Sequence, residues 1–371
     1  MNSKAKSAKP GRGRRKTVAV FFGGRSAEHE ISIVSARSVL KNIDRSRFSP
    51  LPVFIDRKGL WRKTSPENPQ EHGGVSFVPA PGGALYGIKD RKISVRHKVD
   101  AAFPVLHGTD GEDGAAQGLF EIWGIPYVGA RVLGAALSAD KLTAKRLLKS
   151  AGLPVTRFCG LDKKDWKKNR KNAVSSALRE VGVPCFVKPV NLGSSIGIER
   201  IDSPKAAGDA VARSFEFCDT VIFENAVENA REIEVSVMGT DSPRASVAGE
   251  VVPVGDFYDY KAKYGDAGSK LIIPASLPVR LEKKIRSAAL KTFSVLRCSA
   301  MARIDFLLNP DTGEFFVSEL NAIPGFTQIS MYPKLWEASG VPYRDLISRL
   351  IDLAFESAER KKSLKTDCSE K

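Results

Sequence analysis

The sequence predicts an α/β protein in which a parallel α/β layer at the N-terminus is followed by a mixed α+β region. Short apolar segments alternate with helix-like segments over about the first 135 residues, as in a parallel sheet covered by helices. From residue 232 the apolar segments lengthen and follow one another, which is typical of antiparallel strands. A chain of 371 residues with 42% hydrophobic residues is long enough and apolar enough for two or three domains.

The N-terminal part begins with a strand, a glycine turn and a helix. Residues 17–22 are β-branched, apolar or aromatic, Gly23 and Gly24 follow at once, and apolar residues recur at helical spacing over 31–39. The remaining elements expected here are strands at 51–55, 99–106 and 126–128 and a helix at 117–123.

The second half of the chain has longer elements. A helix at 140–151 is stopped by Gly152 and Pro154. The turn-rich segment 309–313 suits an antiparallel hairpin. The other expected elements are strands at 184–189, 220–224, 232–238, 245–252, 302–308 and 315–320, and helices at 281–296 and 343–358.

Composition excludes several classes of protein. No apolar run approaches the ~20 residues that span a bilayer, so we expect no membrane segment. The five cysteines are widely spaced and form no CxxC pair, which argues against a disulfide framework or a thiolate zinc site. No signal-peptide core follows the basic N-terminus, and we expect a cytoplasmic protein.

The net charge of +16 is unevenly distributed. Residues 1–16 carry seven basic side chains and no acid, which leaves +9 for the rest of the chain. We expect this arm to be disordered, and residues 359–371 to form a second polar tail. The arm can bind nucleic acid through phosphates, but it has no interleaved aromatic residues, and a solvated tail is the favoured interpretation.

Two neighbouring strands carry the strongest chemical signal. Arg303 and Asp305 share one face of the first strand, and Glu319 and Asn321 share one face of the next. Two carboxylates and an amide oxygen are ligands that magnesium prefers when phosphates complete its coordination. The alternative is ordinary cross-strand polar pairing, which the apolar residues flanking the acids make less attractive.

Two lysines and a glycine loop suggest contacts with phosphate. Lys188 ends an apolar strand, Lys141 opens a helix, and the loop 191–197 is rich in small residues that let backbone N–H groups approach an anion. Taken singly, each lysine is better explained as a surface residue with a buried stem, and the loop as a turn. The loop is not a Walker A sequence, because no Gly-Lys-Ser/Thr follows.

Three polar loops complete the candidate site. Glu28 follows the first strand and could hold an ammonium group, although an acid at a helix start is also favoured by the helix dipole. His107 begins the polar loop 107–114 and is either an acid/base or orienting group or, as is more common for a lone histidine, a hydrogen-bonded structural residue. The segment 256–268, with three tyrosines and two lysines, is either a lid over the site or an exposed loop.

Six segments, in order along the chain, resemble the D-alanine–D-alanine ligase family of the ATP-grasp superfamily. They are GGRSAEHEIS (23–32), LHGTDGEDGAAQGLFE (106–121), DKLTAK (140–145), VKPVNLGSSIGIER (187–200), FYDYKAKY (257–264) and RIDFLL…GEFFVSELNAIPGFTQISMYPKL (303–335). The resemblance implies a Rossmann-like, pre-ATP-grasp domain followed by a two-lobed ATP-grasp fold. The implied domains are 17–138, a central lobe at 139–227 and a C-terminal lobe at 228–358.

The resemblance also implies the roles of individual residues. ATP would lie between the two lobes, and two Mg²⁺ or Mn²⁺ ions would be held by Asp305, Glu319 and Asn321. Residues near ATP would be Lys141, Lys188, Ser194 and Ser195 at the phosphates, Glu224, Asn225, Ala226 and Val227 at adenine, Glu232 at the ribose and Lys263 at the γ-phosphate. Residues near D-alanine would be Glu28 and His107 for the first molecule, Ser330 and Met331 for the second, Arg303 and the Gly325 N–H at the oxyanion, and Ser194 and Tyr264 linking the lid to Glu28.

The implied reaction converts the first D-alanine to an acyl phosphate, which the amine of the second D-alanine attacks to give the dipeptide for peptidoglycan synthesis. Related ligases that make D-alanyl-D-lactate lack the tyrosine at position 264, so its presence favours an amine acceptor. Acceptance of D-serine or D-lactate stays an alternative, as does a basic nucleic-acid-binding protein with a vestigial nucleotide fold. The family is typically dimeric, so a homodimer is expected.

Overall fold

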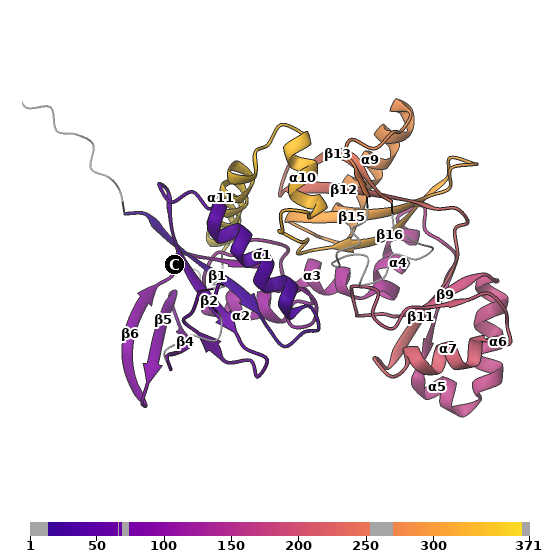
Figure 1. The fold of residues 1–371 in the computed structure, drawn as a ribbon, viewed down its shortest axis with the longest axis horizontal. Helices are drawn as coiled ribbons and strands as arrows, with labels where there is room; N and C mark the ends of the chain where they lie inside the picture. The colour runs from indigo at the N-terminus through magenta and orange to yellow at the C-terminus, as the bar shows by residue number, and fades with distance from the viewer. Residues whose placement is uncertain (1–13, 66, 69–73, 253–269, 366–371) are drawn as a thin grey trace, which may run out of the picture.

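The computed structural model describes residues 14–65, 67–68, 74–252 and 270–365, and it contains three β-sheets (Figure 1). One sheet forms one end of the molecule, a second lies at the opposite end, and the third lies between and above them in this view. The mixed α/β architecture predicted from the sequence is confirmed.

The N-terminal sheet has seven strands in the order β6-β5-β4-β3-β2-β1-β7. Strand β1 pairs in parallel with β2 and with β7. The elements are β1 (Lys16–Gly23), α1 (His29–Asn42), β2 (Phe48–Ile55), β3 (Trp61–Arg62), β4 (Ser76–Ala80), β5 (Ala84–Lys89), β6 (Lys92–Lys98), β7 (Ala101–Pro104), α2 (Ala115–Trp123) and α3 (Val132–Ala139).

The parallel part agrees with the sequence prediction, but the antiparallel extension β3–β6 was not predicted. Strand β6 is mostly exposed and basic, so it carries no continuous apolar run. The strand expected at 126–128 is reduced to a single bridge between Ala102 and Tyr127.

The second sheet is antiparallel, in the order β10-β9-β11-β8. It comprises β8 (Phe158–Asp162), β9 (Cys185–Pro189), β10 (Glu199–Ile201) and β11 (Thr220–Asn225), with α5 (Lys163–Lys168), α6 (Arg170–Val181) and α7 (Ala207–Ser214). The glycine loop lies between β9 and β10. Helix α4 (Lys141–Ser150) precedes this sheet, and Lys141 N donates to the carbonyl of Val190, just after β9.

The third sheet is also antiparallel, in the order β14-β13-β12-β15-β16. Its elements and helices are β12 (Arg231–Gly239), β13 (Arg244–Val252), β14 (Lys270–Ile272), α9 (Val279–Val295), β15 (Ala300–Leu308), β16 (Phe315–Asn321), α10 (Met331–Ala338) and α11 (Tyr343–Lys362). The predicted β15–β16 hairpin is present.

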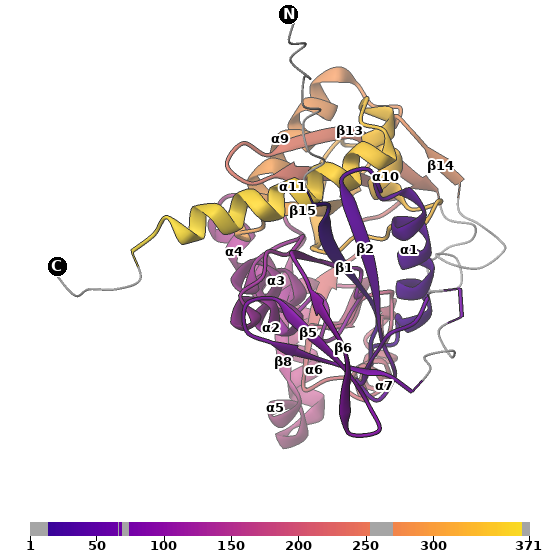
Figure 2. The same ribbon diagram turned by 90° about the vertical axis from the view of Figure 1, so that its left-hand side faces the viewer.

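The C-terminal helices join this sheet to the N-terminal one. Helix α11 packs against α1, β7 and β15 (Figures 1 and 2). One apolar cluster contains Val18 and Phe22 of β1, Phe326, Trp336 of α10 and Leu346 of α11. The segment between β16 and α10 is therefore fixed close to α1.

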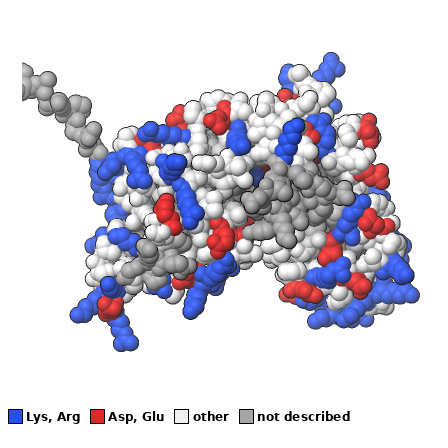
Figure 3. Space-filling view, viewed as in Figure 1, with Lys and Arg blue, Asp and Glu red and all other residues white. Residues whose placement is uncertain are grey.

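Basic side chains are not confined to the N-terminal arm. Figure 3 shows Lys and Arg gathered over the end of the molecule that carries α5 and α6, where the sequences KKDWKK and RKN follow each other closely. Within the described ranges, no helix has the length and apolar character needed to cross a membrane.

Candidate active site

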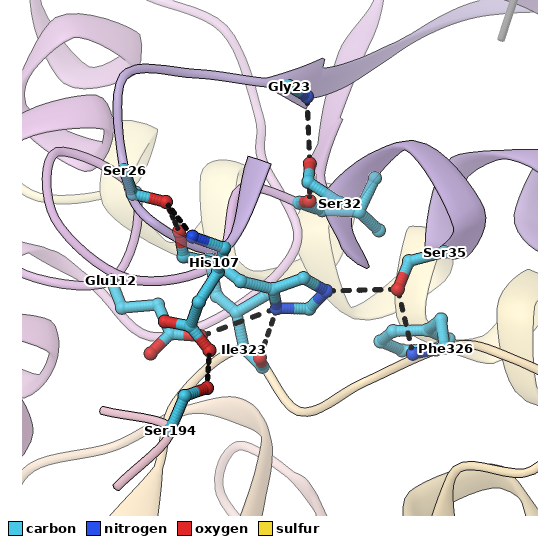
Figure 4. Close-up of polar contacts among 12 residues, drawn as sticks. Gly23, Ser26, Ser32, Ser35, His107, Glu112, Ser194, Ile323 and Phe326 are labelled. Carbon is cyan, nitrogen blue, oxygen red and sulfur yellow. Dashed lines mark hydrogen bonds and ion pairs between the residues drawn. The ribbon is translucent and has the colours of Figure 1, made fainter. Parts of the chain in front are cut away.

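Glu28 lies at the start of α1, where the loop after β1 enters the helix. Its carboxylate accepts a hydrogen bond from the Ser194 hydroxyl, which belongs to the glycine loop between β9 and β10 (Figure 4). A Cβ atom on Gly108 would lie 2.6 Å from Glu28 Oε2, and one on Gly193 would lie 3.4 Å from it. Three loops from separate parts of the chain therefore close around this carboxylate.

The glycine loop holds two non-glycine residues in the left-handed region. Ser194 has φ 53° and Ser195 has φ 58°. Such conformations cost about 1–2 kcal/mol per residue and are concentrated at ligand-binding loops. The loop is therefore held in a specific shape that presents Ser194 to Glu28.

His107 follows β7 and is buried between the first and third sheets. Its Nδ1 atom lies 3.1 Å from the Ile323 carbonyl oxygen and 3.5 Å from Glu112 Oε1. Its Nε2 atom lies 3.0 Å from the Ser35 hydroxyl. Both ring nitrogens thus have partners inside the protein.

His107 and Glu112 both bind protons more tightly than in water. Burial acts to lower the pKa of His107, but Glu112, the charge of Glu28 and the carbonyl of Ile323 together raise it. Burial raises the pKa of Glu112 to about 7, and the charge of Glu28 adds to this shift. We therefore expect the pair to hold at least one proton at neutral pH.

The β15–β16 hairpin brings four predicted site residues together. Arg303 is opposite Asn321, and Asp305 is opposite Glu319. Arg303 donates to both Asp305 oxygens at 2.7 Å, and Asn321 Nδ2 donates to Asp305 Oδ2 at 3.0 Å. From β12, Glu234 adds a further carboxylate 3.0 Å from Arg303 Nε.

These side chains have the chemistry of a magnesium site. Asp305, Glu319 and Asn321 offer carboxylate and amide oxygens, the hard ligands that Mg²⁺ and Mn²⁺ prefer. An ion there would share Asp305 with Arg303 and would need Asn321 to turn its oxygen inward. In the described part of the chain, no three His, Cys, Asp or Glu residues are grouped as a metal site, so the amide and phosphate oxygens would have to complete the coordination.

Of the two predicted phosphate lysines, Lys141 lies beside the β15–β16 hairpin and Lys188 lies against Glu224 in the second sheet. Lys141 Nζ donates to the Leu192 carbonyl at 2.6 Å and lies 3.8 Å from Glu319 Oε2. Lys188 Nζ lies 3.2 Å from Glu224 Oε2. Lys141 therefore connects the glycine loop to the hairpin that carries the acidic residues.

In the segment predicted to bind adenine, several groups already form hydrogen bonds or ion pairs with other parts of the protein. The Glu224 side chain is buried against lysines, Asn225 N donates to the Arg157 carbonyl, and Ala226 N donates to the Pro184 carbonyl, both at 3.0 Å. The adenine and ribose roles of Glu224, Asn225, Ala226, Val227 and Glu232 stay predictions.

The predicted acceptor segment forms a tight turn before α10. A Cβ atom on Gly325 would lie 2.7 Å from Ser330 Oγ, which accepts the Thr327 N–H at 3.0 Å. Met331 begins α10, and its side chain is buried in an apolar cluster with Val251. Any contact of Met331 with a carboxylate would therefore be made by its backbone N–H at the helix start.

One small pocket joins the parts of the site. Its lining includes Gly108 and Glu112 from the loop after β7, Lys141 from α4, Gly193 from the glycine loop, and Glu319 and Asn321 from β16. Its volume is about 50 Å³, room for a few water molecules. Lys263 and Tyr264 lie outside the described residues, so their predicted roles stay predictions.

Sequence analysis missed four residues in contact with the predicted site, namely Ser35, Glu112, Lys145 and Glu234. Lys145 follows Lys141 by one helical turn, and Glu112 lies within the polar loop that His107 begins, so a weak signal existed for both. Ser35 and Glu234 lie in α1 and β12 with no local pattern that distinguishes them.

Two family profiles match consecutive parts of the chain. The profile described as D-ala D-ala ligase N-terminus matches residues 17–130, and the one described as D-ala D-ala ligase C-terminus matches residues 147–352. Together they cover most of the sequence in the order that the resemblance predicts.

Named relatives match over almost their whole length. The D-alanine–D-alanine ligase of Thermoanaerobacter sp. strain X514 is 42% identical over 357 residues, covering 94% of this chain and 98% of the relative. The D-alanine–D-alanine ligase of Shouchella clausii is 41% identical over 374 residues, covering 95% of this chain and 98% of the relative.

Solved structures agree with the sequence matches. The D-alanine-D-alanine ligase from Coxiella burnetii has a TM-score of 0.82 and 33% identity, covering 94% of this chain and 97% of that one. The VanG D-Ala:D-Ser ligase from Enterococcus faecalis has a TM-score of 0.81 and 33% identity, covering 92% and 100%. These likenesses confirm the predicted ATP-grasp fold, and with the profile matches and the identities above they establish that the chain belongs to the D-alanine–D-alanine ligase family.

Proposed function

We propose that the site residues described above carry out ATP-dependent formation of D-alanyl-D-alanine through a D-alanyl phosphate. This proposal rests on one observation, a single pocket that is lined by different parts of the site. Gly108 and Gly193 come from the two loops that close around Glu28, Lys141 comes from α4, and Glu319 comes from β16. An amino acid whose ammonium group binds Glu28 would place its carboxylate next to side chains suited to bind phosphate and divalent ions.

The first D-alanine would be held by charge at both ends. Its ammonium group would pair with the Glu28 carboxylate, which Ser194 and the neighbouring glycines orient. His107 would lie near its carboxylate, where a proton on the imidazole favours an anion. Burial of these groups strengthens each interaction relative to water.

The nucleotide would lie on the other side of this pocket, against the lysines and the acidic residues of the β15–β16 hairpin. Lys141, Lys188 and the Ser194–Ser195 loop would contact its phosphates, and Asp305, Glu319 and Asn321 would hold two Mg²⁺ or Mn²⁺ ions. Those ions, when bound, would neutralise charge on the transferring phosphoryl group. We place Lys263 at the γ-phosphate on the resemblance alone.

Amide bond formation needs groups that stabilise the tetrahedral oxyanion. Arg303 would supply a guanidinium, and Asp305 and Glu234 fix its orientation. Gly325 would supply a backbone N–H. The second D-alanine would place its carboxylate at Ser330 and the Met331 N–H. Its amine would attack the carbonyl carbon of the acyl phosphate, so that the amide C–N bond forms, the C–O bond to the phosphoryl group breaks and inorganic phosphate leaves. We assign Tyr264 to the lid that excludes water and favours an amine acceptor.

We further propose that the protein is a cytoplasmic homodimer with the domain limits implied by its family. Sedimentation equilibrium tests the oligomeric state, with a mass near twice the 40.3 kDa of one chain expected.

The test of the activity is ADP production as a function of D-alanine concentration, with the product identified by mass spectrometry. We expect saturable ADP release and D-alanyl-D-alanine as the product. D-serine, D-lactate and L-alanine are assayed in parallel as competing acceptors. A preference for any of these three over D-alanine would reject the proposed acceptor, and ADP release without dipeptide would reject the reaction.

A further inference from the structure

We propose that Ser35 is a positioning residue that acts with His107 to hold the segment 323–326 and so to aim the Gly325 N–H at the reacting carbonyl oxygen. This inference rests on the proposed function, because it presupposes that the Gly325 N–H contacts an oxyanion. Ser35 lies on α1 in the N-terminal domain, whereas Gly325 follows β16 in the third sheet.

The side chains of His107 and Ser35 contact the segment 323–326 on both sides of Gly325 (Figure 4). His107 Nδ1 lies 3.1 Å from the Ile323 carbonyl oxygen, two residues before Gly325. The Phe326 N–H, one residue after Gly325, donates to Ser35 Oγ over 3.4 Å. Ser35 Oγ and His107 Nε2 are 3.0 Å apart, so the two contacts belong to one hydrogen-bond network.

The donors and acceptors in this network follow from chemistry. A carbonyl oxygen only accepts, so His107 Nδ1 must carry a proton to bond Ile323. In the neutral ring Nε2 is then an acceptor and the Ser35 hydroxyl donates to it, whereas in the protonated ring Nε2 donates to Ser35 Oγ. In both cases Ser35 Oγ keeps a lone pair for the Phe326 N–H. An alanine at position 35 would leave both His107 Nε2 and the Phe326 N–H without this partner.

A second contact holds the same residue, Phe326, through its carbonyl group. Tyr343 OH donates to the Phe326 carbonyl at 2.8 Å, and Ser38 Oγ lies 3.0 Å from that phenol oxygen. The Phe326 ring is fully buried against Phe103 and Tyr332. Because the backbone around Gly325 is fixed at both ends and the adjacent ring cannot move, the direction of its N–H depends on these polar contacts.

The alternative is that Ser35 only satisfies a buried polar group. The two roles differ in what they affect. A stability role would lower the thermal midpoint and leave turnover of the folded enzyme unchanged. A positioning role would reduce kcat with little change in ATP binding, since an oxyanion donor acts in the transition state.

The experiment compares Ser35→Ala and Tyr343→Phe with the control Ser348→Ala in the full-length enzyme. Ser348 is a buried serine of α11 whose hydroxyl bonds only within its own helix, to the Arg344 carbonyl at 3.0 Å, among the contacts the structure describes. Measured quantities are kcat, KM for ATP, the thermal midpoint and inhibition by a phosphinate analogue of D-alanyl-D-alanine, whose tetrahedral phosphorus bears an oxygen in place of the oxyanion.

We expect Ser35→Ala to lower kcat by at least about tenfold and to weaken phosphinate binding by a similar factor, with KM for ATP changed less than about twofold. Tyr343→Phe should act in the same direction, so the proposal is testable even if Ser35→Ala folds poorly. Ser348→Ala should match the wild type in kcat.

Equal kcat and equal phosphinate inhibition in wild type, Ser35→Ala and Tyr343→Phe would overturn the inference while leaving the proposed function intact. Absence of dipeptide synthesis by the wild type would instead overturn the proposed function.

Discussion

Lys145 of α4 and Glu224 of β11 form a buried ion pair, with Nζ and Oε2 3.3 Å apart. Lys145 is 1% exposed and Glu224 is 2% exposed. Lys145 Nζ lies 3.1 Å from Thr156 Oγ1 and 3.2 Å from the Val317 carbonyl of β16, and Lys188 approaches the same Glu224 oxygen. The pair therefore ties the second sheet to the third at the predicted nucleotide cleft.

Burial lowers the pKa of Lys145, partly offset by Glu224, whereas the two lysines lower the pKa of Glu224 in spite of burial. We predict that Lys145→Met lowers the free energy of unfolding by about 3–5 kcal/mol, because removing one partner leaves a buried charge poorly compensated. KM for ATP should rise, since Lys188 becomes the main partner of Glu224. Urea unfolding and steady-state kinetics measure both effects.

The matched control for that variant is Lys149→Met, which removes an exposed lysine one turn further along the same helix, where its ammonium group only approaches the Phe158 ring, 5.7 Å from the ring centroid. Its effect on unfolding should stay within about 1 kcal/mol. Equal stability losses in the two variants would show that the Glu224 pair has no special role.

We predict that Glu28→Gln raises KM for D-alanine at least about tenfold, because a charge-assisted hydrogen bond contributes about 1.5–3 kcal/mol. KM for ATP should change little. Glu30→Gln is the control, since Glu30 is exposed and pairs with Arg57. Initial-rate kinetics with varied D-alanine measure the effect, and an unchanged KM in Glu28→Gln would remove Glu28 from the substrate site.

Local patterns in the sequence predicted the elements with continuous apolar runs. The hairpin of β15 and β16 was predicted from its turn-rich connector, and Asp305 does face Glu319 across it. The short strands β3, β8 and β10 were not predicted, because pairing with longer neighbours stabilises them rather than their own sequence.

Contacts between distant parts of the chain could not be predicted from spacing. Glu28 and Ser194 are 166 residues apart, and only the packing of two domains brings them together. Lys145 was not singled out in the sequence, yet it is buried and contacts Thr156 and Val317. For Glu28 and Ser194, the resemblance to a family supplied predicted roles that residue patterns alone left open.

We predict that Glu319→Gln lowers kcat by about 100-fold at low Mg²⁺ and that added Mg²⁺ restores part of the rate. A neutral amide binds a hard cation more weakly than a carboxylate, and loss of one electrostatic group at a phosphoryl-transfer site commonly has this size. Glu314→Gln, an exposed change next to β16, is the control. Magnesium titrations of the rate measure the effect, and a near-normal rate with normal magnesium dependence would exclude Glu319 as a ligand.

The raised pKa of Glu112 predicts a pH dependence of stability. Burial raises this pKa from 4.5 to about 7, so between these values the folded protein binds a proton that the unfolded chain releases. The free energy of unfolding therefore falls as pH rises through that range, by about 3 kcal/mol for this group. The raised pKa of His107 acts in the same direction.

The variant Glu112→Gln cannot titrate at this position, so its free energy of unfolding should fall less than that of the wild type between pH 5 and pH 8. Urea unfolding at both pH values measures the difference, and Glu121→Gln, a change at a carboxylate whose pKa is lowered, serves as the control. Because a lowered pKa contributes stability that is lost only as pH falls below the ordinary value, the control should keep the wild-type slope above pH 5. A full wild-type slope in Glu112→Gln would mean that another group binds the proton.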